Sequence, residues 1–337
     1  MPVDIEPRHP PAALGRRSRR RQPGDGTPIV VGLVNNMPDA ALESTEAQFR
    51  GLLQAAAGAR AVSLRLSSLA ELPRSPEARE RIARGYWPIA QLLAEPPDAL
   101  IVTGTEPRTP HLREEPYWRS FVELLTWAQR HTVASVWSCL AAHATVEELD
   151  GIERRRLPEK RCGLYAHSIL SGHPLLRGVS APLMMPHSRW NDLPVPALRE
   201  AGYTLLSWSQ ETGADAFVRD RESLMVFFQG HPEYEDTTLL KEYRRDVGRF
   251  LAGTQPAYPT LPQGYFSPEA SAALSAFRAR AIGDRRPELI ESFPFAAAAA
   301  ALVNTWRSAA VAIYRNWLAH VASAHRPLQL ADTVPPQ

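Results

Sequence analysis

The sequence has little of what marks several protein classes. It contains two cysteines, Cys139 and Cys162, which cannot form a disulfide framework and suit a reducing cytosol. No apolar run has the length of a transmembrane span or the pattern of a signal peptide, so we expect a cytoplasmic protein with no membrane partner. No Gly-x-x-x-x-Gly-Lys loop is present, and no His, Cys, Asp or Glu cluster has metal-ligand spacing. We therefore expect neither nucleotide hydrolysis nor a bound metal.

The net charge is small but unevenly placed. Lysine and arginine number 38 against 36 aspartate and glutamate residues, a formal charge of +2, yet arginines crowd into residues 16–21. No aromatic residue lies in this segment to stack on bases, so we expect residues 1–27 to form a disordered basic arm rather than a nucleic-acid contact. A single α/β domain is expected over residues 28–322, followed by a polar tail over residues 323–337.

Apolar and amphipathic segments alternate through the first half of the chain. Short, mostly apolar runs predict strands over residues 28–34, 61–66, 98–103 and 132–137. Helical patterns follow these strands over residues 40–57, 75–93, 117–130 and 140–150. This alternation predicts an α/β fold, a parallel sheet with helices on both faces in a flavodoxin-like sandwich. In such folds, functional side chains gather at the carboxyl ends of the strands.

The second half is less regular. Residues 184–190 place polar side chains between prolines and aromatics, which favours a loop, either lining a site or merely on the surface. A strand meander is predicted over residues 203–208, 214–218 and 223–228, followed by a helix over 236–251. Ser267 and the proline after it predict another helix start, and a final helix with one apolar face is expected over residues 296–322.

Cys139 lies where a buried strand turns sharply into a helix. Such a turn lifts the side chain out of the sheet and places it at a helix N-terminus. Unpaired backbone N–H groups there favour a thiolate and can hold a developing oxyanion. A lone buried cysteine is more often inert, so its assignment as a nucleophile depends on a partner elsewhere in the chain.

The partner is predicted in His231-Pro232-Glu233, which follows another buried strand. In extended backbone the first and third of these residues point to the same side, and the proline limits how far they drift apart. A carboxylate beside an imidazole fixes its tautomer and stabilises the imidazolium, so His231 can serve as a general base. Cys139, His231 and Glu233 together predict a nucleophilic triad.

Further motifs occur in a fixed order around these three residues. They are Asn36-Met37-Pro38, Thr45-Glu46-x-Gln48-Phe49, Leu100-Ile-Val-Thr-Gly104, Tyr117-Trp118, Glu159-Lys160, Gly163-x-Tyr165-x-His167, Pro186-His187-Ser188-Arg189, Gly230-His-Pro-Glu-Tyr234, Glu242-Tyr243-x-Arg245-Asp246-Val247 and Asn316-Trp317-Leu318. With Cys139 they make residues 30–321 resemble the homoserine O-succinyltransferases of methionine synthesis, which are built like class I glutamine amidotransferases.

The resemblance implies a two-step acyl transfer that needs acyl-CoA as a co-substrate and no resident cofactor. Cys139 would attack the thioester of acyl-CoA and hold the acyl group as an acyl-enzyme. His231, oriented by Glu233, would then take the proton from the hydroxyl of a small amino acid, L-homoserine. The backbone N–H of Leu140 would help to hold the oxyanion.

The resemblance also implies which residues bind substrate. Lys160 and Ser188 match family positions that contact substrate, and Arg245 matches an arginine expected to grip the amino acid's carboxylate bidentately. A homodimer is what the family suggests.

Three positions depart from the family pattern. Arg108 occupies the position that selects the acyl donor, where the family has Gly for succinyl or Glu for acetyl. An arginine there could pair with the free carboxylate of a succinyl group, which favours succinyl-CoA, or it could pair with Glu106 or face solvent. His143 and Asn35 replace the usual Gln and Leu. Acetyl-CoA as donor and serine as acceptor therefore stay open.

Two other classes of function share this scaffold. A glutamine amidotransferase-like amide hydrolase would usually carry glycines on both sides of the elbow cysteine, where this chain has Ser138 and Leu140. A non-catalytic binding protein would have no need of the triad together with Arg245. Acyl transfer is therefore the prediction.

Overall fold

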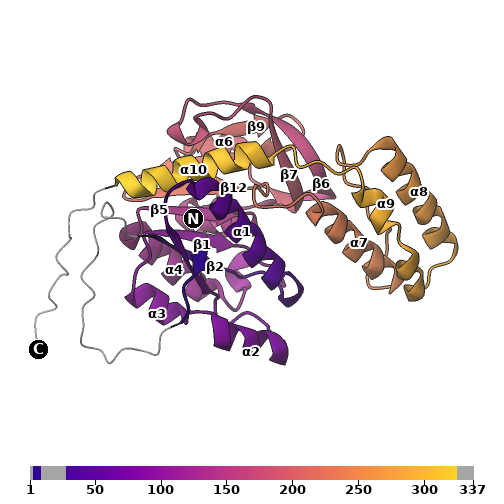
Figure 1. The fold of residues 1–337 in the computed structure, drawn as a ribbon, viewed down its shortest axis with the longest axis horizontal. Helices are drawn as coiled ribbons and strands as arrows, with labels where there is room; N and C mark the ends of the chain where they lie inside the picture. The colour runs from indigo at the N-terminus through magenta and orange to yellow at the C-terminus, as the bar shows by residue number, and fades with distance from the viewer. Residues whose placement is uncertain (1–2, 9–27, 325–337) are drawn as a thin grey trace, which may run out of the picture.

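The computed structural model describes residues 3–8 and 28–324, and an eight-stranded sheet lies at its centre (Figure 1). The strand order is β1-β3-β2-β4-β5-β12-β11-β8, parallel from β1 to β12 and antiparallel at β11 and β8. These strands are β1 (Val3–Ile5), β2 (Ile29–Val34), β3 (Val62–Ser67), β4 (Ala99–Thr103), β5 (Ala134–Ser138), β8 (Thr204–Leu205), β11 (Ala216–Asp220) and β12 (Leu224–Phe228). The predicted α/β class is confirmed.

Helices cover both faces of this sheet, because successive strand residues point to opposite sides. Ile101 and Val136 pack in the cluster that contains α1 and α10, whereas Leu100 and Trp137 pack in the cluster that contains α4 and α5. The helices of these layers are α1 (Leu42–Ala57), α2 (Pro76–Gly85), α3 (Ile89–Ala94), α4 (Trp118–His131), α5 (Leu140–Asp150), α6 (Val195–Glu200) and α10 (Arg307–Ser323). Short 3₁₀ turns are η1 (Asp39–Ala41), η2 (Leu112–Glu114), η3 (Pro174–Leu176) and η4 (Pro287–Ser292).

A second, antiparallel sheet has the order β10-β9-β6-β7. Its strands are β6 (Arg155–Ile169), β7 (Leu183–Asp192), β9 (Ser207–Ser209) and β10 (Gly213–Ala214). The loop predicted over residues 184–190 is therefore wrong: these residues lie in β7. Pairing with β6 satisfies their backbone, and the alternation of strand side chains buries Met185, His187 and Arg189.

A helical lobe with its own apolar cluster projects beyond the second sheet (Figure 1). It contains α7 (Thr238–Leu251), α8 (Pro268–Gly283) and α9 (Phe295–Ala299). The helix start predicted at Ser267 is confirmed, since its Oγ accepts a hydrogen bond from the Ala270 N–H at 3.2 Å. The single final helix predicted over residues 296–322 is wrong. The chain breaks between α9 and α10, where the side chains of Asn304 and Trp306 both donate to the Tyr234 carbonyl.

The prediction of a disordered arm is wrong for residues 3–8. The strand β1 pairs in parallel with β3, which would otherwise be the edge of the sheet, and Val3 is fully buried. The rest of the arm, residues 1–2 and 9–27, and most of the predicted tail lie outside the described residues. Within the described ranges, no helix combines the length and apolarity needed to cross a membrane.

Candidate active site

Three neighbouring strands of the main sheet end at the same level and carry the predicted site. Thr103 at the end of β4 pairs with Ser138 at the end of β5, which pairs with Phe228 at the end of β12. Gly104, Cys139 and the 229–234 loop leave the sheet from these ends. The expectation that the site forms at the carboxyl ends of the strands is therefore consistent with the observed geometry.

Cys139 makes the sharp turn that the sequence predicts. Its φ of 51° is the only positive value for a non-glycine residue in the described part of the chain. Such a conformation costs about 1–3 kcal/mol and persists only where the surroundings enforce it. Here the Cys139 N–H donates to the Phe228 carbonyl at 2.7 Å, and α5 begins at the next residue. The thiol is half-buried at the N-terminus of that helix.

The Leu140 N–H, the predicted oxyanion donor, faces the end of β4. A Cβ placed on Gly104 would lie 2.9 Å from the Leu140 nitrogen and 2.5 Å from the Leu140 Cβ. Such contacts are closer than real Cβ atoms make, so only glycine leaves room beside this amide. Gly104 is part of a sequence motif, but the motif alone does not indicate this contact with the Leu140 amide.

His231 lies between Glu233 and Cys139. Its Nδ1 is 2.8 Å from Glu233 Oε1, its ring stacks on Tyr234 with centroids 4.2 Å apart, and Cys139 lies close enough to act on its charge. Burial by itself lowers the pKa of the imidazole, but the negative charges of Glu233 and a Cys139 thiolate outweigh it and hold that pKa well above its usual value. The arrangement favours an imidazolium beside the sulfur.

The predicted substrate residues meet around α7, close to this triad. Lys160 Nζ donates to Asp246 Oδ2 at 2.8 Å, and Arg245 Nη2 lies 2.9 Å from Asp246 Oδ1. The Ser188 hydroxyl donates to Glu242. The structure thus brings Lys160, Ser188 and Arg245 together, although they lie on β6, β7 and α7.

Glu242 belongs to the motif Glu242-Tyr243-x-Arg245-Asp246-Val247, and the structure gives it a role that the motif alone does not indicate. This carboxylate accepts from Ser188 at one oxygen and from the Tyr234 hydroxyl, at 2.8 Å, at the other. It stands one helical turn before Arg245, so α7 presents a carboxylate and a guanidinium side by side. The three-residue spacing of Glu242 and Arg245 is the signal in the sequence for this pair, because a binding site for a zwitterionic amino acid needs one group of each charge.

Arg108 is exposed and does not pair with Glu106. Glu106 lies 3.2 Å from Arg249 Nη2 instead. The Arg108 side chain makes no hydrogen bond or ion pair with the residues that the structure describes. Its backbone N–H, however, donates to Glu115 Oε1, a buried carboxylate that also receives the Thr109 N–H at 2.8 Å. The Glu115 carboxylate therefore fixes the backbone of the loop after β4, while the Arg108 guanidinium is exposed and accessible to a ligand.

The other two departures from the family pattern are buried and have polar partners. His143 is buried on α5 with Nε2 2.9 Å from Gln229 Oε1, and burial, followed by the charge of Arg189, lowers the pKa of His143 to about 3. Asn35 donates to the Leu42 carbonyl and to the Tyr86 hydroxyl, so its amide braces the start of α1.

One buried cluster brings together possible metal ligands that their spacing in the sequence does not reveal. His167, His187 and Asp215 bring ligand atoms within 4.8 Å of one another, although they are far apart in sequence. The donor directions do not fit a metal. Arg189 Nε donates to His187 Nδ1 at 3.3 Å, so in a neutral ring Nε2, the atom facing Asp215, carries the hydrogen and has no lone pair to offer.

Comparison with known proteins agrees with the motifs. The family model for homoserine O-succinyltransferase matches residues 14–328. The homoserine O-succinyltransferase of Methylorubrum extorquens is 48% identical over 292 residues, 87% of either chain. That of Rhodopseudomonas palustris is 44% identical over 323 residues, 96% of this chain and 97% of the relative. A solved glutamine amido transferase from Methylobacillus flagellatus is 14% identical with a TM-score of 0.48, covering 87% of this chain and 94% of that one. The chain belongs to the homoserine O-succinyltransferase family.

Proposed function

We propose that this protein transfers a succinyl group from succinyl-CoA to the hydroxyl of L-homoserine, a step in methionine synthesis, through a thioester on Cys139. The observation that carries the proposal is that His231 bonds to Glu233 and lies beside Cys139, at the turn into α5, in a chain of this family. The chain would work in the cytosol, as a homodimer, with acyl-CoA as its co-substrate and without a resident metal or cofactor.

In the first step, the Cys139 thiolate attacks the carbonyl carbon of the acyl-CoA thioester. The oxyanion that forms is held by the Leu140 N–H at the start of α5. The carbon–sulfur bond to CoA breaks, and CoA leaves as a thiol with the proton that the His231 imidazolium donates. One thioester replaces another, and His231 is left as a neutral base.

In the second step, the hydroxyl oxygen of homoserine attacks the acyl-enzyme while His231 takes the hydroxyl proton. The tetrahedral intermediate collapses, the bond to Cys139 breaks, and the thiolate returns beside the imidazolium. Glu233 holds the ring in the required tautomer throughout and stabilises its positive form.

The acceptor would lie between this triad and α7. Arg245 would bind its carboxylate, and Glu242, one turn away, would bind its ammonium group. Lys160 and Ser188 line the same region from the second sheet. The acyl chain would lie beside the elbow, near Gly104, Thr105 and Tyr117, which line a small hollow there. Arg108, exposed on the loop after β4, would meet the free carboxylate of a succinyl group.

Two measurements test this function. Succinyl-CoA alone should release CoA and add one succinyl mass to the peptide holding Cys139, whereas Cys139→Ala should do neither. Turnover of Cys139→Ala at the wild-type rate would exclude the covalent route.

A substrate matrix tests the specificity. We expect kcat/KM to be highest for succinyl-CoA with homoserine among the four pairs of succinyl-CoA or acetyl-CoA with homoserine or serine. Arg108→Gly should reduce the preference for succinyl-CoA over acetyl-CoA. An unchanged preference would remove Arg108 from donor selection, and a higher value with serine would reassign the acceptor.

A further inference from the structure

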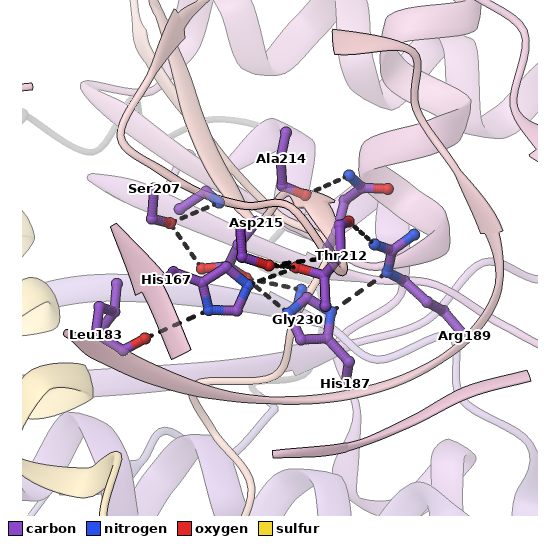
Figure 2. A network of polar contacts seen from close by, with 12 residues as sticks. His167, Leu183, His187, Arg189, Ser207, Thr212, Ala214, Asp215 and Gly230 are labelled. Carbon is purple, nitrogen blue, oxygen red and sulfur yellow. Dashed lines mark hydrogen bonds and ion pairs between the residues drawn. The ribbon is translucent and has the colours of Figure 1, made fainter. Parts of the chain in front are cut away.

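A fully buried polar network adjoins the loop that carries His231 (Figure 2). Its side chains come from three strands and two connections, which brings together parts of the chain that are distant in sequence. The members are His167 on β6, His187 and Arg189 on β7, Ser207 on β9, Thr212 before β10, and Asp215 between β10 and β11. A buried charge or amide is retained only where partners satisfy it, so the partners of Asp215 are informative.

Asp215 holds the backbone just before the catalytic histidine. Its carbonyl accepts the Gln229 N–H at 2.8 Å, and its Oδ1 accepts the Gly230 N–H at 3.2 Å. Its Oδ2 accepts the Ser207 hydroxyl at 2.8 Å, which fixes the carboxylate itself. The His231 N–H then donates to the Pro186 carbonyl at 2.9 Å, so the first three N–H groups of the loop are all held from outside it.

Gly230 is packed so tightly against the network that no side chain fits at this position. A Cβ on this residue would lie 2.6 Å from Asp215 Oδ1, 2.5 Å from Met185 Cγ and 3.1 Å from His187 Cε1. The Asp215 carboxylate therefore both bonds to the loop backbone and packs directly against it at Gly230.

His187 links the same carboxylate to the acceptor side of the site. Its Nε2 lies 3.4 Å from Asp215 Oδ1. Burial, followed by the charges of Arg189 and His167, lowers the pKa of His187 well below its usual value, so the ring is neutral. Its neighbour Ser188 donates to Glu242 in the predicted acceptor region. One carboxylate thus contacts both the strand that carries Ser188 and the loop that carries His231.

We propose that Asp215 is a positioning residue of the acyl transfer, which holds His231 at its working distance from Cys139 and from an acceptor bound beside Ser188. This inference rests on the proposed function. Asp215 touches neither substrate nor the reacting atoms, and its effect passes through the Gly230 backbone and His187. A misplacement of about 1 Å costs on the order of a hundredfold in rate, which sets the scale of the expected effect.

Asp215→Asn is the principal test, because it keeps the size of the side chain and removes its charge. With succinyl-CoA alone, the amount of CoA released in a single turnover counts intact sites, and its rate constant reports on the chemistry. We expect one CoA per chain, as in the wild type, with a rate constant and a kcat lower by about 10–100-fold. The KM values for both substrates should change little.

Ser207→Ala provides a second variant should Asp215→Asn fail to fold. It frees Asp215 Oδ2 and the Ala216 N–H and leaves the loop contacts in place, so we expect full CoA release with a rate lower by roughly 2–10-fold. The double variant should be no slower than Asp215→Asn, because Ser207 acts through Asp215. Thr132→Val is the control. It removes a buried hydroxyl that donates to the Ala128 carbonyl, and Thr132 lies just before β5, at the end of that strand away from Cys139. It should lower the melting temperature and leave the rate unchanged.

The outcomes separate the two proposals. If the wild type releases no CoA, the proposed function is wrong. If the wild type reacts and both variants match its rate, Asp215 has no positioning role. If the amount of CoA released falls in proportion to kcat while the rate constant stays at the wild-type value, Asp215 only stabilises the fold, and the inference is wrong.

Discussion

Gly104→Ala isolates the contribution of the Leu140 N–H to the reaction. The added methyl group would stand 2.9 Å from the Leu140 nitrogen and 3.0 Å from its Cα, and both atoms belong to backbone that cannot rotate away. Either the loop after β4 or the start of α5 must shift, which misaligns the amide from the oxyanion. Loss of one such donor lowers kcat by about 10²–10³-fold, or about 3–4 kcal/mol in the barrier. We expect a fall of this size in steady-state kcat.

The nucleophile itself should survive this substitution. Cys139 should still be alkylated by iodoacetamide at close to the wild-type rate, since alkylation forms no oxyanion. Gly85→Ala makes the same chemical change where a Cβ meets nothing within 4 Å, and it should leave kcat unchanged. A Gly104→Ala enzyme within threefold of the wild-type kcat would refute the assignment of this amide.

The remaining predictions concern charge and metal. Because its folded-state pKa is raised, His231 stabilises the fold fully below its unfolded pKa of about 6.5 and loses this contribution as the pH rises through the folded value. Glu233→Gln should therefore lower the free energy of unfolding, measured in urea, by about 1.5–3 kcal/mol at pH 6 and by less at pH 9.5. An equal loss of stability at both pH values would contradict this linkage. Arg245→Lys should raise the KM for homoserine by about 10-fold or more, with the KM for succinyl-CoA unchanged, whereas Arg244→Lys on the same helix should alter neither. Dialysis against EDTA should leave kcat and the melting temperature unchanged, and stoichiometric metal in the untreated protein would overturn the donor directions assigned to His187.

The sequence pattern predicted secondary structure correctly where interactions between residues near in sequence determine it. Four parallel strands and the helices between them follow from short apolar runs and amphipathic periodicity, and they match β2, β3, β4 and β5 to within about two residues. The elbow at Cys139 was predictable for the same reason, because a buried strand followed at once by a helical pattern leaves one residue for the turn.

Local pattern failed where distant partners determine the structure. Residues 184–190 look like a loop because their polar side chains are buried among partners from β6 and residues 212–215 that no local pattern reveals. Residues 3–5 become a strand only because β3 has an unpaired edge. The final helix is broken because Asn304 and Trp306 bind the Tyr234 carbonyl, which is 70 residues or more away in sequence.

The candidate site divides in the same way. The sequence by itself determined the histidine–carboxylate pair and the family, and it predicted the nucleophile, since adjacent residues and ordered motifs carry that information. Only the tertiary structure decided that Gly104 lies against the Leu140 amide, that Glu242 joins Ser188 to Tyr234, and that Asp215 holds the loop of the general base. Each of these is a contact between strands or helices that are far apart in the chain, so its energy depends on packing that no single segment encodes.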